Sequence, residues 1–485
     1  MPIETTTTFN PSPDNQQRKI NEPTSVIASA YPRWSRNRAF VDGEEAVKAL
    51  ATACLPKANP DDSLAEYQAF LDRTRFLPAA SKIAQGLSGL IFRKSAQLNT
   101  KSVRVQVLAQ LITPDLQSLD DLAEWVVRET LITNFTGLLV DHPAKELFKD
   151  VNGKSTLSAA NEISKGYRPR IAGYCGETIL EITPGIVNEA RQIVYVRLLE
   201  NEGKRVRELM LNDGVYQVRV WKKEGSAFLP GPITTPTRDN APLNVIPFYL
   251  ISTSDKLVPT PSMLQHAVDL NLQHYRIQGL LTSVLYFLSA PIPVVTGLKA
   301  AQDKDGKEIP IKLNVAPGAA WIFPEEGTEA KYLEFSGAGA SVITDELRIV
   351  KDELSTLGHS IMTPEKPAPE APETQMLRRA AENATLAGFT RTISRKLERT
   401  LKQFALWADP AAAADLKYTL NTDFLPQQMT PQEMTALMAM WTAGAITHSQ
   451  LLHSLVDGEI LSSALDIEGE IERTKMETTD RPPVL

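Results

Sequence analysis

Hydrophobic residues along this chain follow two different periods, and the change between them divides the sequence. From residue 31 to 94 they recur at helical spacing, and Pro60 with the polar residues after it marks a helix start. Two more helices are predicted over 103–135. From 137 to 253 the pattern alternates or runs apolar between turn residues, which predicts a β-rich module. The chain is therefore expected to be α+β.

The longest helical pattern covers 262–289. Its apolar positions alternate in steps of four and three, which makes a heptad-like seam of Met263, Ala267, Leu270, His274, Ile277, Leu281, Val284 and Leu288. At the helical rise per residue this helix is roughly 40 Å long. A second seam, closed by a predicted C-cap at Gly358, consists of Ile343, Leu347, Val350, Leu354 and Leu357. Short strands over 290–340 are predicted to form a β insert between the two helices.

The remaining segments are irregular or helical. Residues 1–30 hold few large apolar groups and predict a disordered arm. Residues 359–374 hold four prolines and no aromatic residue, which favours an exposed, stiff loop. A helix from 375 to 408 follows. Capping boxes begin further helices at Thr430 and Thr447.

Composition is that of a globular protein that does not span a membrane. The 485 residues are 42% hydrophobic and 22% charged, with a net charge of −7, so a basic surface that grips nucleic acid everywhere is excluded. Cys54 and Cys175 are too few for a disulfide framework or a cysteine-rich zinc site, and both are expected to be reduced and buried. The polar first residues are not a secretory signal, so synthesis in the cytoplasm is expected.

Candidate catalytic motifs have more ordinary interpretations. The GKST run at 153–156 lacks the earlier glycine of a phosphate-binding loop, because Phe148 occupies that position, and is predicted to be a turn. DKDGKE at 303–308 is predicted to be a hairpin turn rather than a calcium loop. His266 and His274 lie too far apart for a helical zinc pair, and His274 is expected to be packed with a local hydrogen bond. No catalytic constellation is found, so neither an enzyme nor a cofactor is predicted.

The helix from 375 is basic. Its cations are Arg378, Arg379, Arg391, Arg395, Lys396, Arg399 and Lys402. Two interpretations stay open with equal weight: a solvated face, or contact with nucleic acid or an acidic partner subunit.

Several quoted segments, in their order, resemble a known family. They are WSRNRAFVDGEEAV, YQAFLDRTRFLPAASKIAQGLSGLIFRKSA, RPRIAGYCGETILE, VIPFYLIS, LNLQHYR and AKYLEFSG. Over about 31–460 this set is similar to the portal proteins of tailed double-stranded DNA phages. The resemblance is to a subfamily first catalogued as a domain of unknown function.

The resemblance implies the portal fold, assembled as a ring, usually of twelve subunits, at one capsid vertex of the virion. The fold would have an α/β wing, a two-helix stem, a small β clip and a helical crown. The implied parts are an arm (1–30), wing (31–253), first stem helix (262–289), clip (290–340), second stem helix (341–358), tunnel loop (359–374), long helix (375–408), crown (409–470) and flexible tail (471–485).

The resemblance also assigns site residues. The tunnel loop would face DNA through Thr363, Pro364, Glu365, Lys366, Pro367, Glu370 and Glu373. The clip would face terminase or adaptor through Lys304, Asp305, Lys307, Glu308, Glu325 and Glu326. The stem seam would consist of Met263, Leu270, Ile277, Leu281, Val284, Leu347, Val350 and Leu354.

The implied partners are further copies of the chain, double-stranded DNA in the channel, a large terminase, a head-to-tail adaptor, and a major capsid or scaffolding protein. Residues 262–358 hold 8 basic and 12 acidic side chains, a net charge of −4, which suits a passage that must not grip moving DNA. Alternatives are a head-to-tail adaptor or other phage ring component without DNA gating, and an enzyme such as a phage nuclease or motor subunit.

Overall fold

The computed structural model describes most of the chain, and every statement below concerns the described residues. They are 18–143, 166–187, 189–238, 241–289, 292–297, 301–302, 308–309, 327–333, 338–362, 372–424, 429, 431–458, 460–461 and 467–480. The chain forms two compact units. The first unit comprises Met1–Ser35, Ile83–Leu264 and His359–Leu485, and the second comprises Arg36–Lys82 and Gln265–Gly358. Helices and antiparallel sheets both contribute, so the predicted α+β class is confirmed.

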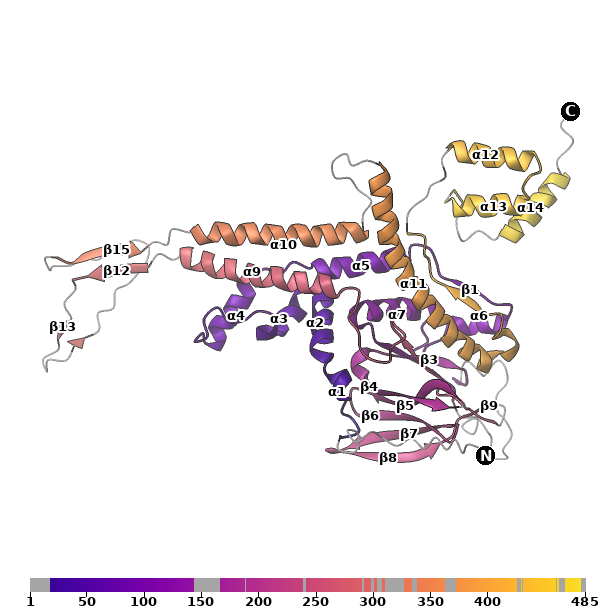
Figure 1. Ribbon diagram of the computed structural model, residues 1–485, viewed down its shortest axis with the longest axis horizontal. Coiled ribbons are helices and arrows are strands. Elements are labelled where there is room, and N and C mark those ends of the chain that lie inside the picture. Colours follow the sequence, from indigo (N-terminus) through magenta and orange to yellow (C-terminus); the bar gives the residue numbers. More distant parts are fainter. Residues whose placement is uncertain are drawn as a thin grey trace. The chain divides into compact units, whose positions relative to one another are not determined.

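A five-stranded antiparallel sheet lies in the first unit (Figure 1). Its strands, neighbours in chain order, are β4 (Ile179–Val187), β5 (Ala190–Glu200), β6 (Arg205–Asn212), β7 (Val215–Glu224) and β8 (Ala227–Thr234). The two-residue turn between β6 and β7 is Asp213–Gly214, with φ values of 48° and 72°. Positive φ at both positions matches the twist of the flanking strands, which explains why Asp-Gly occurs here.

A three-stranded sheet of the first unit is ordered β11 (Phe248–Ile251), β2 (Thr136–Asp141) and β3 (Arg170–Tyr174). Helix α7 (Leu119–Thr133) leads into β2 through Asn134, whose φ is 53°. The amide of Asn134 donates to Thr253 Oγ1 at 2.8 Å and to Thr260 Oγ1 at 2.9 Å. The core of this unit contains Trp34, stacked on Phe135 with ring centroids 5.6 Å apart.

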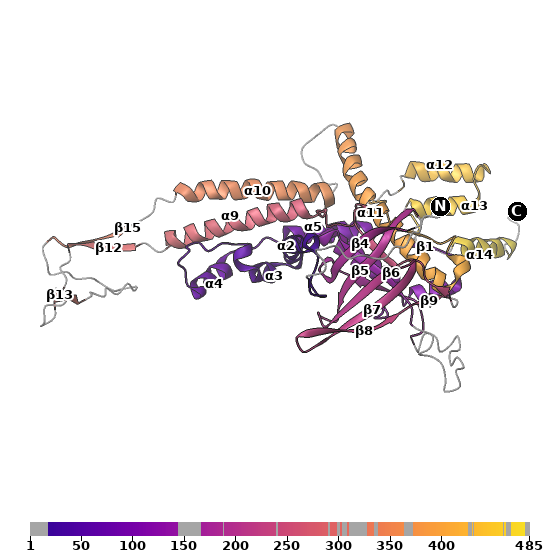
Figure 2. The ribbon, with the colours of Figure 1, turned by 60° about the horizontal axis from the view of Figure 1, so that its bottom comes forward.

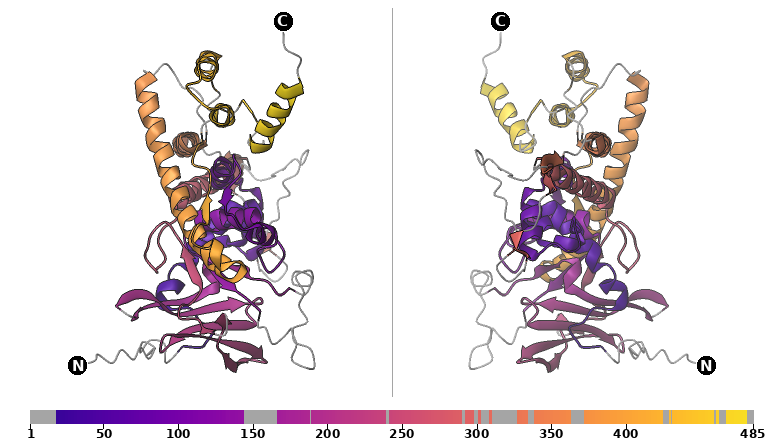
Figure 3. Two further views of the ribbon diagram at one scale, coloured as in Figure 1. Left: turned by 90° about the vertical axis from the view of Figure 1, so that its right-hand side faces the viewer. Right: turned by 90° about the vertical axis from the view of Figure 1, so that its left-hand side faces the viewer.

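Helix α11 (Pro372–Ala408) contacts β11 and β2 of this smaller sheet and is the long orange helix of the first unit in Figure 3. The other elements of this unit are short. They are α1 (Ser25–Ala28), β1 (Gln97–Asn99), α6 (Val103–Ala109), η4 (Gly176–Thr178), β9 (Thr237–Arg238), β10 (Ala241–Pro242), η5 (Pro410–Ala412), β16 (Lys417–Thr419), α12 (Pro431–Thr442), α13 (His448–Asp457) and α14 (Ile467–Asp480). Helices α2 (Tyr31–Asp42) and α5 (Ala79–Ile91) contribute residues to both units.

The second unit is built on two long helices. Helices α9 (Gln265–Ser289) and α10 (Ala338–Met362) lie side by side in Figures 1 and 2. Between them in sequence come β12 (Ile292–Thr296), β13 (Ala301–Gln302), β14 (Glu308–Ile309) and β15 (Glu329–Leu333). β12 pairs with β15 antiparallel, from Ile292 opposite Leu333 to Thr296 opposite Glu329. The unit also holds α3 (Glu44–Ala49), η2 (Ala51–Ala53) and α4 (Leu64–Arg73).

One face of α9 packs on the N-terminal helical residues of the second unit. Phe76 lies edge-on between Phe40 and Tyr275, with ring centroids 5.5 and 5.6 Å away. A Cβ atom at Gly279 would lie 2.6 Å from Leu55 Cδ1, so glycine permits the close approach here. The sequence seam does not include these positions, so α9 buries a second face that the heptad pattern did not reveal.

Two helix boundaries differ from the predictions. Gly358 is not a C-cap, because α10 continues to Met362; glycine inside a helix costs only about 1 kcal/mol. Helix α11 begins at Pro372 rather than 375, and proline favours the first turn. Glu373 therefore lies in a helix and not in the predicted loop.

Both predicted flexible ends contain structure where they are described. Residues 18–30 include α1, and Ile27 and Ala30 are buried, so the prediction of a disordered arm is wrong for this part. Helix α14 covers residues 467–480, so the predicted flexible tail is wrong for 471–480. Met263 lies before the first residue of α9, and Cys175 is half-buried rather than buried.

Candidate functional site

The seams of α9 and α10 are covered to different degrees. Val350 and Leu354 are buried, with 1% and 3% of their surface exposed. Ala267 and His274 on α9 are buried as well, with 2% and 6% of their surface exposed. The seam residues Leu270, Ile277, Leu281, Val284 and Leu347 are half-buried. Burial of the seam is therefore most complete in the N-terminal half of α9 and the C-terminal half of α10.

His274 is a buried member of the α9 seam. Burial lowers the pKa of its imidazole, and the charge of Lys351 on α10 lowers it further. Within the described residues its Nδ1 atom has no hydrogen-bond partner, so the local hydrogen bond predicted for this histidine is not found at that atom. His274 thus fits a packing role.

Large apolar side chains stand on the outer surface of the helix pair. Leu280 on α9 is 60% exposed, and Val342 and Ile349 on α10 are 69% and 50% exposed. Val342 and Ile349 are seven residues apart and share one helix face with the exposed Glu346 and Glu353. This surface, defined by Leu280, Val342 and Ile349, is called the outer apolar surface.

Most predicted clip and tunnel-loop residues lie outside the described residues. These are Lys304, Asp305, Lys307, Glu325, Glu326, Thr363, Pro364, Glu365, Lys366, Pro367 and Glu370. Glu308 lies in β14. The GKST run at 153–156 is also outside the described part. The clip and tunnel-loop assignments and the turn at 153–156 therefore stay predictions.

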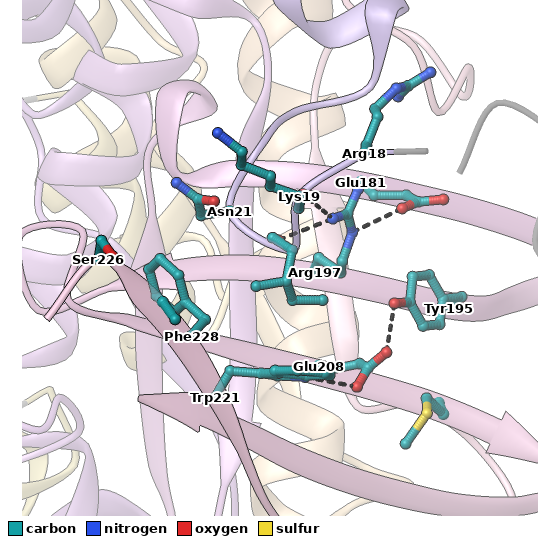
Figure 4. A pocket seen from close by; sticks show the side chains of 13 residues that line it. Arg18, Lys19, Asn21, Glu181, Tyr195, Arg197, Glu208, Trp221, Ser226 and Phe228 are labelled. Atoms are coloured by element: carbon teal, nitrogen blue, oxygen red, sulfur yellow. Dashed lines mark hydrogen bonds and ion pairs between the residues drawn. The ribbon is translucent and has the colours of Figure 1, made fainter. Parts of the chain in front are cut away.

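Sequence reasoning missed a charged cavity on the five-stranded sheet (Figure 4). The cavity has a volume of about 660 Å³, and residues 18–21 form one wall. Arg197 Nε donates to Glu181 Oε2 at 2.8 Å, and both side chains are at most 5% exposed. Arg197 Nη1 also donates to the backbone carbonyl oxygen of Ile20 at 2.9 Å. The buried guanidinium therefore anchors the N-terminal segment that composition predicted to be disordered.

Glu208 is the second carboxylate that lines this cavity, and both of its oxygens accept hydrogen bonds. Glu208 accepts from Tyr195 Oη at 2.6 Å and from Trp221 Nε1 at 2.9 Å. Burial and the neighbouring Glu208 raise the pKa of Tyr195 far above its ordinary value. The phenol stays protonated and both oxygens of the carboxylate are bonded, so Tyr195, Glu208 and Trp221 form a structural network.

The basic residues of α11 separate into distinct environments. Lys396 Nζ donates to the backbone carbonyl oxygens of Ser252 at 2.8 Å and Ser254 at 2.9 Å. Lys402 pairs with Glu398 at 2.6 Å. Three arginines of the helix remain exposed: Arg391, Arg395 and Arg399. The side chains of Arg378 and Arg379 lie outside the described part.

Two kinds of site are absent from the described residues. No three His, Cys, Asp or Glu side chains in the described ranges gather closely enough to hold a metal ion. No helix within those ranges has the length and hydropathy needed to cross a membrane.

Comparison with known proteins identifies one part of the chain. Residues 264–408 match a family model described as a domain of unknown function (DUF4055). This part of the chain is similar to the DUF4055 family. It contains α9, α10 and α11, and the match confirms the predicted resemblance to a subfamily catalogued under such a description. A search of curated proteins finds no match.

Solved structures of a gene transfer agent (GTA) particle share weak similarity with the chain. A chain from "Neck of empty GTA particle computed with C6 symmetry" is 11% identical, with a TM-score of 0.35, over 78% of this chain and 90% of that one. A chain from "Virion of native gene transfer agent (GTA) particle" is 11% identical, with a TM-score of 0.34, over 84% and 97%.

Proposed function

We propose that this chain is the portal protein of a tailed double-stranded DNA phage. Copies form a ring at one capsid vertex, and DNA passes through it during packaging and ejection. The ring docks a large terminase and a head-to-tail adaptor. The chain carries out no reaction itself, and ATP hydrolysis belongs to the terminase.

The pair of long helices with a β hairpin between them carries the proposal. Helices α9 and α10 have 25 residues each, so each is roughly 37 Å long. β12 and β15 pair beyond the ends of these helices (Figure 2). A paired stem that spans a shell wall and presents a small sheet at its tip requires this arrangement.

The outer apolar surface supports assembly into a ring. Leu280, Val342 and Ile349 are each at least 50% exposed. Burying such side chains contributes about 25 cal/mol per Å² of apolar surface, which only a partner can supply here. A ring needs two different faces on each copy, and α9 and α10 offer different sets of side chains.

Charge on α10 supports a passage that does not hold DNA. Asp345 and Asp352, seven residues apart, are both exposed beside the face that carries Val342 and Ile349. Carboxylates release no counterions from DNA and repel its phosphates. In the proposed ring, they would let the duplex slide. The alternative is a head-to-tail adaptor or other ring component without the gating role.

The test is the assembly state of the purified full-length chain, measured by mass photometry and end-on negative-stain microscopy. The expected result is a ring of about a dozen copies with an axial hole. Val342→Glu combined with Ile349→Glu places two carboxylates on the outer apolar surface and should convert rings to monomers. Monomeric wild-type protein at micromolar concentration would refute the proposal.

A control distinguishes loss of the interface from a general effect of added charge. Leu64 on α4 is 85% exposed and lies outside the helix pair, so Leu64→Glu should leave rings intact. If Leu64→Glu also abolished rings, the outer apolar surface would have no special role. Circular dichroism should show unchanged helix content in both variants.

A further inference from the structure

Three exposed arginines of α11 share one helix face. Arg391, Arg395 and Arg399 follow each other at intervals of four residues. Side chains four apart lie on one face, about 6 Å apart along the axis. The helix therefore presents a row of guanidinium groups rather than a scattered positive charge.

The row ends at a second cavity, of about 350 Å³, on the first unit. Arg399 lines it together with Arg191 at the start of β5, and with Lys256 and Lys396. Asp255 is the carboxylate that lines this cavity. Lys396 lies near both Arg395 and Arg399, whose charges help to lower its pKa, although burial is the larger cause. We call Arg191, Lys256, Arg391, Arg395 and Arg399 the cationic patch.

The arginines of the row are not neutralised by neighbours that the structure describes. Lys396 donates to two backbone carbonyls and lies 3.8 Å from Asp255. Within the described residues, no ion pair or hydrogen bond joins Arg391, Arg395 or Arg399 to another group. In a chain with a net charge of −7, this concentration of unpaired positive charge is a local site that favours an external anion.

The surroundings favour a nucleic-acid backbone over an acidic protein. Protein interfaces are centred on buried aromatic or aliphatic anchors. Among the described side chains of α11, no large hydrophobic residue is exposed. Arginine binds phosphate through two parallel hydrogen bonds, and a DNA strand offers one charge per roughly 3.4 Å of axis, so each arginine of the row can meet a different phosphate.

We propose that the cationic patch holds the phosphodiester backbone of double-stranded DNA. This inference rests on the proposed function, which brings the chain to DNA, and it adds a surface that grips the duplex. The exposed carboxylates of α10 would then let DNA slide past, whereas the cationic patch would retain it. The patch would bind phosphates, so binding should not depend on base sequence.

The experiment measures binding of a short fluorescent duplex to the full-length protein by anisotropy at several salt concentrations. Arg391→Glu, Arg395→Glu and Arg399→Glu are combined in one variant. Affinity should fall at least tenfold, and the slope of log K against log salt should become shallower by about one for each phosphate that is no longer bound. Arg→Gln at the same positions, which removes charge without reversing it, should give a smaller loss in the same direction.

A matched control reverses three exposed cations away from the patch. Lys204 lies in the turn between β5 and β6, Lys222 and Lys223 lie on β7, and all three are exposed. Their change to glutamate alters the net charge equally, so equal losses in both variants would refute the patch. DNA binding that survives the triple arginine reversal unchanged would also refute it. Binding of polyglutamate but not DNA would assign the patch to an acidic protein instead.

The assembly state of every variant separates this inference from the portal proposal. The patch lies within one copy, so a protein that fails to form rings can still bind DNA through it. A protein that forms rings but shows no patch-dependent DNA binding would refute only the present inference.

Discussion

The five-stranded sheet buries charged side chains, whereas the helix pair of α9 and α10 exposes apolar ones. On the sheet, Arg197 and Glu181 are charged yet buried, and each has its partners within the first unit. On the helix pair, Leu280, Val342 and Ile349 are apolar yet exposed. The first unit pairs its buried charged groups internally, whereas the helix pair leaves these apolar side chains exposed.

This difference indicates where the molecule has its function. A fully bonded polar network stabilises a particular arrangement of strands and offers nothing to a partner. Large exposed apolar side chains are unfavourable in water and stabilise an assembly that buries them. Under the proposed function, the charged cavity would be scaffold and the long helices would form the contacts between copies.

The largest expected effect comes from breaking the buried pair. Arg197→Met leaves Glu181 without its counter-charge, and such a loss costs about 3–5 kcal/mol. The free energy of unfolding, measured by urea denaturation, should fall by that amount. Lys204→Met removes a surface pair whose side chains are 66% and 89% exposed, and should change stability by less than about 0.5 kcal/mol.

The double variant Arg197→Met, Glu181→Met sharpens this test, because both charges are then absent. It should recover most of the lost stability. Equal stability of Arg197→Met and Lys204→Met would show that the buried pair contributes nothing, and the contrast between the regions would lose its basis.

A smaller effect is expected from a buried amide of the second unit. Asn271 accepts from the backbone amide of Ala80 at 3.0 Å and donates to the carbonyl oxygen of Leu77 at 2.9 Å. Asn271→Ala removes the acceptor of the buried Ala80 amide, whereas the carbonyl oxygen of Leu77 keeps its bond from the backbone amide of Ala79. The change should cost about 1–3 kcal/mol in the same measurement. Gln273→Ala, at an exposed position of the same helix, should cost less than about 0.5 kcal/mol.

The smallest effect concerns pH. His274 has a folded pKa below its ordinary value of 6.5, so the unfolded chain takes up its proton first as pH falls. This histidine therefore contributes stability above pH 6.5 that is lost progressively below it. His274→Leu should reduce the fall in unfolding free energy between pH 7 and acidic pH. A steeper fall in the variant would contradict the assignment.

Local patterns predicted local structure well. Ser63 and Thr447 form capping boxes at the starts of α4 and α13, because a cap depends on residues three positions apart. The long helices over 265–289 and 338–362 followed from the recurrence of apolar residues. Alternation identified the β-rich module, although β6 and β8 were not singled out.

Local sequence patterns could not predict interactions between residues that are distant in sequence. The segment at 18–30 holds few apolar residues, and it is ordered because Arg197, far along the chain, binds its carbonyl oxygens. Gly358 lies buried inside α10 rather than after its end. Neither fact has a local signature.

The sequence by itself determined the α+β class, the order of the elements and the two long amphipathic helices, because periodicity is set by each segment's own backbone geometry. Only the tertiary structure decided which faces of α9 and α10 are covered, which charges are paired, and which arginines of α11 are left exposed. Burial and pairing depend on residues brought together from distant parts of the chain, and no local pattern records them.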